Sequence, residues 1–434
     1  MTDEEKTTDR ATQKRGHLLV VFLAVFIDLL GFGIVLPLLP IYAKYLTSDS
    51  SGMVLGLLMA SYSAMQFLFA PLWGRLSDRI GRRPILMLGL LGSVIFYALF
   101  GIASSMGSLL WMFVSRIGAG IAGATIPTAQ AYIADTTSKE NRAKGMALIG
   151  AAFGLGFTFG PLLAATALIS SGEAQAHLSP WPGFTASILS AGALLLAFFK
   201  LPESLRPDSL PAEHRLLNLS ALHTAVSIPT VGTLLLISFV SVLSFSGFES
   251  VLSVLLKTDV TAGGFGYGLV EVLMLFAGLG FVHALAQGLV RGMSSHMSET
   301  RLATGGAAVA ILGYVLLVVA IDRQSLGLLI GAMAVEAVGF AFLPPTVQAL
   351  ISRRSDPGRQ GSILGVAQSV SAMARILGHA ICFPLFYIAT TIPFVVGAAL
   401  MAVALLLIAT IARRGGDFGH AVKAAEPEPV GEGD

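Results

Sequence analysis

Five ionisable residues stand inside long apolar stretches of the sequence. Three are acids, Asp28, Glu249 and Glu336, and two are arginines, Arg116 and Arg375. A charged side chain at the centre of a bilayer costs about 2.5–3.5 kcal/mol on insertion scales, so such residues are candidates for function. Three acids against two arginines leave at least one carboxyl without a fixed cationic partner. Because loss of water favours its neutral form, that group can bind and release a proton.

Other residues in the same stretches are weaker candidates. His283 and His379 could relay protons near neutral pH, although a histidine on a helix is more often a packing residue. Gln130 and Gln348 could line a cavity or bond across helices. Aromatic side chains could form an apolar pocket, or could simply pack: Phe32, Tyr62, Phe245, Phe248 and Phe340. We take the two glutamines, Phe32 and Phe245 as cavity candidates.

The composition indicates which solvent surrounds these residues. Hydrophobic residues make up 55% of the 434-residue chain and charged residues 12%, with a mean hydropathy of +0.79. A soluble domain carries about 25% charged residues, and a membrane span needs roughly 20 apolar residues. The sequence therefore predicts an all-α membrane protein with helices over 17–43, 53–73, 84–104, 109–134, 143–170, 183–201, 229–256, 265–289, 302–321, 326–351, 361–389 and 391–412.

Positive charge is unevenly divided between the loops. With the N-terminus in the cytoplasm, most of the 27 Lys and Arg residues lie on the cytoplasmic side, and only Lys44, Lys257 and Arg323 lie outside. The positive-inside rule favours this orientation. Polar segments divide the chain into a disordered tail over 1–16, helical bundles over 17–201 and 229–412, a linker over 202–228 and a tail over 413–434, with both termini cytoplasmic.

The two predicted six-helix halves resemble each other. P-T-A-Q-A-Y-I over 127–133 matches P-T-V-Q-A-L-I over 345–351, and G-F-G-I-V-L over 31–36 matches G-F-E-S-V-L over 247–252. Both matches fall on corresponding spans, at nearly the same offset. Repeated halves around a central site are typical of carriers that alternate access. A duplicated membrane protein without transport activity is the alternative.

The loop between the second and third spans reads G-R-L-S-D-R-I-G-R-R-P over 74–84. Positive-inside charge and a tight turn explain its arginines and glycines, but not its single acid. The loop resembles the signature of the major facilitator superfamily, which implies a fold of two pseudo-symmetric six-helix bundles. The matching residues, which the resemblance implies to be a conformational latch, are Gly74, Asp78, Arg79, Gly81, Arg82 and Arg83. In that family the aspartate is thought to contact the N-terminus of a helix in the other half, here the span that begins near Gly361.

Two more stretches carry the resemblance. Arg116 in S-R-I-G-A-G-I-A-G-A resembles the fourth-helix arginine motif, and residues 150–163 resemble the fifth-helix motif that marks antiporters. The antiporter residues are Gly154, Gly156, Gly160 and Pro161. The pattern is most similar to the tetracycline-resistance-type drug:proton antiporters. Since the first and fourth helices are neighbours in this family, Asp28 and Arg116 are a candidate ion pair, either opened by a proton or permanent.

The sequence also departs from that group. Tetracycline carriers have an aspartate in the third helix, whereas Phe96 stands in its place here, and alanines replace the glycines that often follow Pro161. The missing acid argues against metal–tetracycline as the substrate. F-S-G-F-E over 245–249 is similar to broader relatives of the group, some of which resemble organic-anion carriers.

We expect a proton-coupled secondary transporter that exports a small organic, drug-like compound across an inner or plasma membrane. The alternatives are a symporter or uniporter of an organic anion or another metabolite, and a non-transporting receptor or scaffold. No P-loop, metal cluster or catalytic motif is present, so we expect no enzymatic activity, no bound cofactor, no metal and no nucleic-acid partner. The single cysteine, Cys382, is expected to be a buried apolar residue, and the chain is expected to be a monomer.

Overall fold

The computed structural model describes residues 3–137, 142–173, 177–205, 229–355 and 360–414. Helices of the N-terminal half are α1 (Asp3–Val35), α2 (Leu38–Leu46), α3 (Met53–Ile80), α4 (Arg82–Ser105), α5 (Leu109–Ala122), the 3₁₀ turn η1 (Gly123–Thr125), α6 (Ile126–Thr136), α7 (Arg142–Ser170) and α8 (Trp181–Lys200). Those of the C-terminal half are α10 (Pro229–Lys257), the 3₁₀ turn η2 (Val260–Ala262), α11 (Leu269–Met293), α12 (Glu299–Arg323), α13 (Leu326–Arg353), α14 (Gln360–Ile388) and α15 (Ile392–Arg414).

Twelve membrane spans are present among the described residues, counting α1–α2 and α5–α6 as one span each. This confirms the predicted number and the all-α membrane fold. Residues 3–16, predicted as a disordered tail, continue helix α1. Most of the predicted linker over 202–228 and of the tail over 413–434 lies outside the described residues.

Several helices extend beyond the predicted spans, because a helix continues through polar residues until something turns the backbone. The second span, predicted to end at residue 73, ends as α3 at Ile80. Gly81 follows with φ of 106°, a conformation that a residue with a Cβ atom adopts only under strain. The arginine-rich loop is therefore a sharp turn between two helix ends.

Two spans are broken beside a proline. Pro37 separates α1 from α2, and η1 separates α5 from α6 just before Pro127. Proline lacks an amide hydrogen and crowds the preceding turn, which interrupts a helix. The second break divides the fourth span into α5, which contacts α3 and α4, and α6, which also contacts α1.

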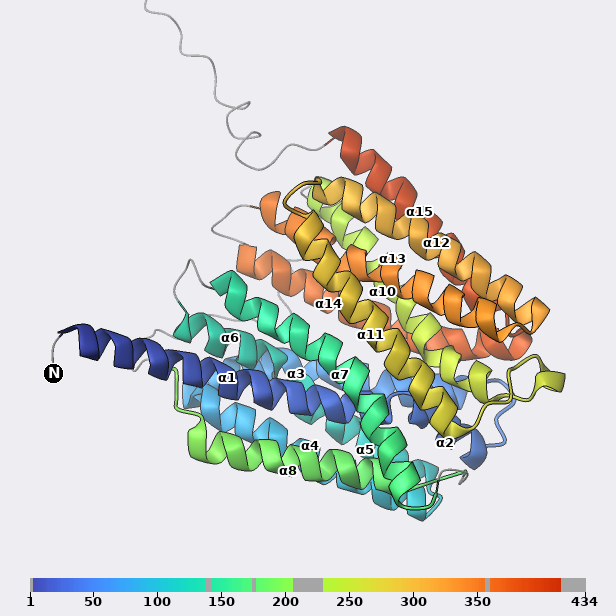
Figure 1. Ribbon diagram of the computed structural model, residues 1–434, viewed down its shortest axis with the longest axis horizontal. Helices are drawn as coiled ribbons and strands as arrows, with labels where there is room; N and C mark the ends of the chain where they lie inside the picture. Colours follow the sequence, from blue (N-terminus) through green and yellow to red (C-terminus); the bar gives the residue numbers. More distant parts are fainter. Residues whose placement is uncertain (1–2, 138–141, 174–176, 206–228, 356–359, 415–434) are drawn as a thin grey trace, which may run out of the picture.

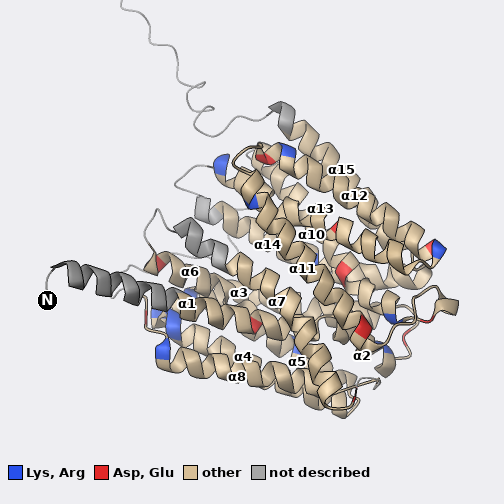
Figure 2. Cartoon of the chain, viewed as in Figure 1, with Lys and Arg blue, Asp and Glu red and all other residues tan. Residues whose placement is uncertain are grey.

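The helices form two pseudo-symmetric halves, coloured blue to green and yellow to red in Figure 1. In the first half α1 contacts α7 and α8, and α4 contacts α5 and α8. In the second half α10 contacts α14 and α15, and α12 contacts α13 and α15, so the same pairings recur. The halves meet where α7 contacts α11 and α3 contacts α14. Charged residues gather mostly at the helix ends, with a few acids near the middle (Figure 2).

The two halves are joined at one end of the bundle. We call the end with Arg79, Arg82 and Arg83 the basic end, and the end with Lys44 and Thr258 the opposite end. One buried apolar cluster runs along the C-terminal half and includes residues of both halves at the opposite end, among them Leu38, Tyr42, Leu55, Phe248, Leu252 and Phe383. A second cluster near the basic end, with Val21, Leu86, Tyr132 and Ile149, belongs to the N-terminal half alone. Among the described residues, the apolar contact between halves therefore ends before the basic end.

Close backbone contact accompanies this joining. A Cβ atom on Gly56 of α3 would lie 2.8 Å from the Ala380 carbonyl oxygen of α14. At the opposite end of the bundle, the Lys44 ammonium donates a hydrogen bond to Thr258 Oγ1 at 2.9 Å and so links α2 to the residue that follows α10. By contrast, glycines on the interface helices toward the basic end have nothing within 4 Å of a Cβ position: Gly150, Gly288 and Gly365.

Asp49 caps the N-terminus of α3 in the loop outside the membrane spans. Its carboxylate accepts hydrogen bonds from Ser51 Oγ at 2.6 Å and from the amides of Ser51 and Val54, each at 2.8 Å. The Ser51 hydroxyl and then these amides hold the pKa of Asp49 below its usual value. A carboxyl with a depressed pKa stabilises the fold above its unfolded value of about 3.9, and this stabilisation is lost as the pH falls through the folded pKa.

We therefore expect Asp49→Asn to lower the melting temperature by about 1–2 °C at pH 7, since Asp49 is partly exposed. The difference from wild type should shrink below about pH 4. Thermal unfolding of both proteins in detergent at pH 7 and pH 3.5 measures this. An equal gap at both pH values would show that the charge of Asp49 contributes nothing.

Candidate functional site

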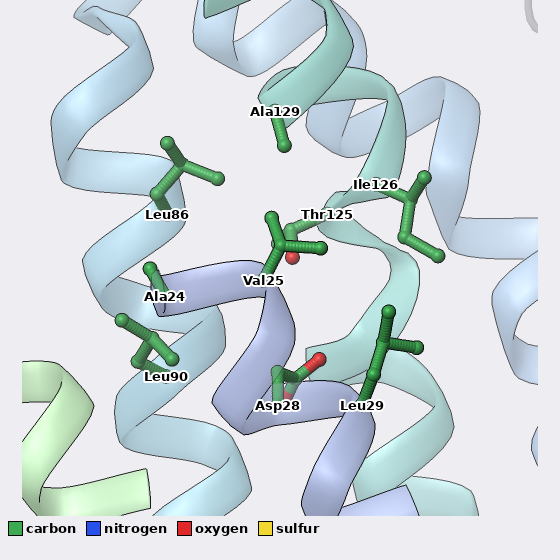
Figure 3. Close-up of a pocket in the computed structure, with 9 residues that line it drawn as sticks. All are labelled: Ala24, Val25, Asp28, Leu29, Leu86, Leu90, Thr125, Ile126 and Ala129. Carbon is green, nitrogen blue, oxygen red and sulfur yellow. The ribbon is translucent and has the colours of Figure 1, made fainter. Parts of the chain in front are cut away.

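Asp28 lies two turns before the end of α1 at Val35, and its carboxyl contacts α4. Ser93 Oγ donates to Asp28 Oδ1 at 2.5 Å, and the Tyr97 hydroxyl donates weakly to the Asp28 carbonyl at 3.4 Å. The carboxyl faces a small, largely apolar pocket between α1, α4 and the break in the fourth span (Figure 3), lined by Ala24, Val25, Leu29, Leu86, Leu90, Thr125, Ile126 and Ala129. Asp28 thus has one hydroxyl donor and a small space in front of it.

The predicted Asp28–Arg116 ion pair is not formed in this conformation. No described cation lies within ion-pair distance of Asp28, and the Arg116 guanidinium instead lies over the Tyr62 ring, 4.4 Å from its centroid. Arg116 of α5 does approach α1, but at Phe32, one turn beyond Asp28, where its guanidinium carbon lies 6.0 Å from the ring centroid. Arg116 is only 2% exposed, and its Nε atom has no hydrogen-bond partner.

Tyr62 of α3 is the residue around which the central charges gather. It interacts electrostatically with Asp28 and Arg116 of its own half and with Arg375 of the other half. Its hydroxyl accepts a hydrogen bond from Gln66 Nε2 at 3.1 Å, and this amide also donates to the Gly123 carbonyl at the helix break. The sequence predicted Tyr62 only as one aromatic among several; its central position follows from the α3–α14 contact between the halves.

The acids of the C-terminal half differ in their surroundings. Glu249 on α10 is half-buried and interacts electrostatically with Arg375. Arg375 in turn interacts with Glu249 and Tyr62. Glu336 on α13 is fully buried and interacts with Tyr314 and Glu249. The sequence left open which acid Arg375 accompanies; the geometry favours Glu249.

Aromatic rings from both halves surround this centre. In the N-terminal half Phe32 lies 5.0 Å from Tyr62 and 5.9 Å from Phe157, measured between ring centroids. In the C-terminal half Phe245 stacks on Phe340 at 3.8 Å. The cavity candidates Phe32 and Phe245 are therefore half-buried members of two aromatic groups, one in each half.

The remaining candidates are less central. His283 makes a 3.3 Å hydrogen bond to the Ala337 carbonyl and a 3.1 Å contact with Gln287, so both ring nitrogens have partners. His379 Nδ1 lies 2.5 Å from Ser250 Oγ, and the ring interacts electrostatically with Arg375. Gln130 is half-buried and Gln348 is exposed. The hydroxyl partners Ser93, Tyr97 and Ser250 were not found from the sequence, although Tyr97 and Tyr314 repeat at an offset of 217.

The arginine-rich loop is held within the N-terminal half. Arg82 pairs with Asp78 and, through Nε, with Asp135 of α6 at 3.3 Å. Arg83 donates to the Phe198 carbonyl of α8, Arg79 is exposed, and Gly74 has nothing within 4 Å of a Cβ position. The predicted contact of Asp78 with the helix near Gly361 concerns side chains that lie outside the described part of the chain.

Glu203, which the sequence did not indicate as a site residue, caps α4 beside this loop. Its two carboxylate oxygens accept hydrogen bonds from the amides of Arg82 at 2.8 Å and Arg83 at 3.1 Å. A Cβ atom on Gly81 would collide with the Glu203 carboxylate. An acid at a helix N-terminus accepts hydrogen bonds from the free amides and interacts favourably with the helix dipole. The segment after α8 therefore fixes the turn between α3 and α4.

We expect Glu203→Ala to destabilise the protein by about 1 kcal/mol, because two amides of α4 lose their acceptor. Glu203→Gln keeps one acceptor oxygen and should cost less. Thermal unfolding of both variants, with proteolysis at the loop over 74–84 as a local measure, tests this. Equal protease resistance of wild type and Glu203→Ala would contradict the capping role.

The glycines of the antiporter motif lie at two helix crossings. A Cβ atom on Gly160 would lie 2.7 Å from the Gly33 carbonyl carbon of α1, and one on Gly156 would lie 3.0 Å from the Leu29 backbone. Gly154 instead faces Ala284 of α11 in the other half, 3.2 Å from its Cβ. Pro161 is buried inside α7. The motif therefore lets α7 approach the helix of Asp28 on one side and the opposite half on another.

Comparison with known proteins agrees with this architecture. The family model of the Major Facilitator Superfamily matches residues 21–379. Tetracycline resistance protein, class C, of Escherichia coli is 33% identical over 395 residues, covering 89% of this chain and 95% of that protein. Major facilitator superfamily domain-containing protein 10 of Mus musculus is 28% identical over 456 residues, covering 92% and 93%. The crystal structure of the human organic anion transporter MFSD10 (TETRAN) is 26% identical, with a TM-score of 0.63, covering 91% and 99%.

Two six-helix halves joined at one end, with ionisable groups where they meet, define a membrane transporter. The chain belongs to the major facilitator superfamily, within its tetracycline-resistance-type group. The names of the similar proteins refer to tetracycline resistance or to an organic anion transporter.

Proposed function

We propose that this transporter exports a small, largely apolar organic compound in exchange for protons. The observation that carries the proposal is the placement of one half-buried acid from each half, Asp28 and Glu249, around Tyr62 and the arginines at the interface. Neither acid has a described ion-pair partner within 4 Å. Groups at an interface between moving halves change their neighbours when the halves rock, and such a change alters proton affinity.

The proposed orientation places the basic end in the cytoplasm, since Arg79, Arg83 and Arg353 lie there. The conformation described above would then admit substrate from the cytoplasm. Both termini would be cytoplasmic, in an inner or plasma membrane, with a monomer as the working unit and the proton as coupling ion. A cysteine introduced at Ser51 should react with an impermeant maleimide in intact cells, and one at Ile80 should not.

Transport by proteoliposomes under an imposed pH gradient tests the proposal. Tetracycline serves as probe because of the class C relative. Asp28→Asn should abolish gradient-driven transport and retain counterflow, because the amide keeps an acceptor for Ser93 but cannot exchange a proton. Ser93→Ala removes the hydroxyl donor and keeps the acid, so coupling should persist with a shifted pH profile. Unchanged pH dependence in Asp28→Asn would make Asp28 a structural residue.

A second candidate is transport of an organic anion. Arg116 lies beside the Phe32 and Tyr62 rings, and its Nε atom has no hydrogen-bond partner among the described residues. Arg375 interacts with Tyr62 from the other half. Two guanidinium groups among aromatic side chains suit an aromatic carboxylate. Fluorescein, tested in the same proteoliposomes, discriminates the candidates: transport of fluorescein that is lost in Arg116→Met would favour the anion.

A further inference from the structure

Glu336 stands apart from the acids at the interface. It lies on α13 inside the C-terminal half, is 0% exposed, and neither carboxyl oxygen makes a hydrogen bond of good geometry with a described residue. Gly313 of α12 lies directly against it: a Cβ atom on Gly313 would be 2.6 Å from the Glu336 Cα. The acid is thus enclosed in a helix crossing and does not face the site around Tyr62.

The internal repeat shows that this crossing has an apolar counterpart. Gly89 of α4 packs against the Ala122 carbonyl, and Gly306 of α12 packs against the Gly339 carbonyl, each pair related by an offset of 217. Toward the other end of the same crossing, Phe96 fills the space at Gly118 in the N-terminal half. At the offset of 217, Gly313 is the equivalent of Phe96, and Glu336 is the equivalent of Ala119, the residue after Gly118. In the C-terminal half Glu336 fills the space at Gly313, so an acid lies at a crossing where the N-terminal half has a packing contact between a phenyl ring and a glycine.

Within the described part of the chain, no cation faces Glu336 from the helices packed around it. Tyr314 comes from α12 and Glu249 from α10, and these are the ionisable groups with which it interacts. His283 of α11 is bonded to the carbonyl of the adjacent Ala337. On α14, Arg375 interacts with Glu249 and Tyr62, and His379 is bonded to Ser250. A carboxylate buried beside another acid and without a cation is strongly disfavoured.

The hydroxyl hydrogens of this network are compatible with a protonated Glu336. Ser244 Oγ lies 2.9 Å from the Tyr314 oxygen and 3.1 Å from the Gly397 carbonyl. One Ser244 hydrogen cannot serve both contacts. If Ser244 donates to Gly397, Tyr314 must donate to Ser244, and the Tyr314 oxygen is then free to accept. Glu336 is the adjacent group that can supply a donor, and it can do so only when it carries a proton.

We propose that Glu336 is a proton-retaining carboxyl that donates to Tyr314 and so ties α13 to α10, α12 and α15 throughout the transport cycle. No bond forms or breaks in this role. It deepens the proposed function by leaving Glu249 as the exchangeable acid of the C-terminal half, and for that consequence it rests on the proposed function. The chain Glu336–Tyr314–Ser244–Gly397 is a positioning network and not a substrate contact.

Infrared difference spectroscopy of the purified protein tests the protonation state without transport. Wild type minus Glu336→Gln at pH 7 should show the loss of one protonated-carboxyl band, which Tyr314→Phe should shift. Loss of carboxylate bands instead would overturn the proposal. Glu336→Gln keeps an N–H donor for Tyr314 and should melt close to wild type, whereas Glu336→Met, similar in size but without a donor, should melt lower; equal melting of the two variants would also overturn it.

Transport separates this inference from the proposed function. If wild type couples tetracycline or fluorescein movement to a pH gradient, Glu336→Gln should keep that coupling and Glu249→Gln should lose it. A folded Glu336→Gln protein without coupling would overturn the retained proton. If wild type itself shows no coupling, the proposed function fails, and the infrared band still decides whether Glu336 holds a proton.

Discussion

Replacing Gly160 by valine should lower the melting temperature by about 5 °C or more, a large effect for a single substitution. A Cβ atom at this position would lie 2.7 Å from the Gly33 carbonyl carbon and 2.9 Å from the Ile34 amide nitrogen. Both are backbone atoms, which cannot rotate away. Overpacking typically costs about 1–3 kcal/mol, and collision with backbone places this substitution at the upper end.

Gly150→Val is the matched control, because Gly150 lies on the same helix and has nothing within 4 Å of its Cβ position. Both substitutions change helix propensity equally, so their difference reports the α1–α7 crossing alone. Thermal unfolding monitored by fluorescence-detected gel filtration measures it. If the melting temperature of Gly160→Val equals or exceeds that of Gly150→Val, α1 and α7 are farther apart than described.

Neutralising Glu249 should have a large effect on transport. Glu249→Gln is expected to reduce gradient-driven transport at least tenfold and to preserve counterflow, because a neutral amide beside Arg375 still fits but cannot exchange a proton. The pH profile of the residual activity should be flat. Proteoliposomes with tetracycline and fluorescein as probes, with and without a pH gradient, measure both quantities.

Glu271→Gln is the control for this change. Glu271 is exposed in the first turn of α11, at the opposite end of the bundle. Its replacement by glutamine is the same chemical change, made away from the interface. Its gradient-driven transport should equal that of wild type. If Glu249→Gln retains a wild-type pH profile, the exchangeable acid of the C-terminal half is not Glu249, and Asp28 alone would remain as the coupling candidate.

The membrane spans and the internal repeat could be predicted because both depend on local sequence: the spans on apolar composition, and the repeat on matching residues. Apolar runs of about 20 residues require helices in lipid, whatever else surrounds them. The helix ends could not be predicted as well. α3 continues to Ile80 through charged residues because its end is set by the turn at Gly81 and the Glu203 cap, and Glu203 is more than 120 residues away in sequence.

The Asp28–Arg116 pair shows where reasoning about spans fails. Treating the fourth span as one helix next to the first suggested that its arginine reaches the acid. In the structure Arg116 meets α1 at Phe32, one turn beyond Asp28, and its guanidinium lies over Tyr62. The adjacency of two helices does not specify the level at which their side chains meet.

The sequence by itself determined that this chain crosses a membrane twelve times in two related halves, and that it carries a few ionisable residues there. These properties depend on residue type and local periodicity, since lipid excludes unpaired charge and unbonded backbone. Only the tertiary structure decided which of those residues meet. It placed Asp28, Glu249 and the arginines around Tyr62 and enclosed Glu336 behind Gly313, because partners are set by helix crossings between residues that are distant in the sequence.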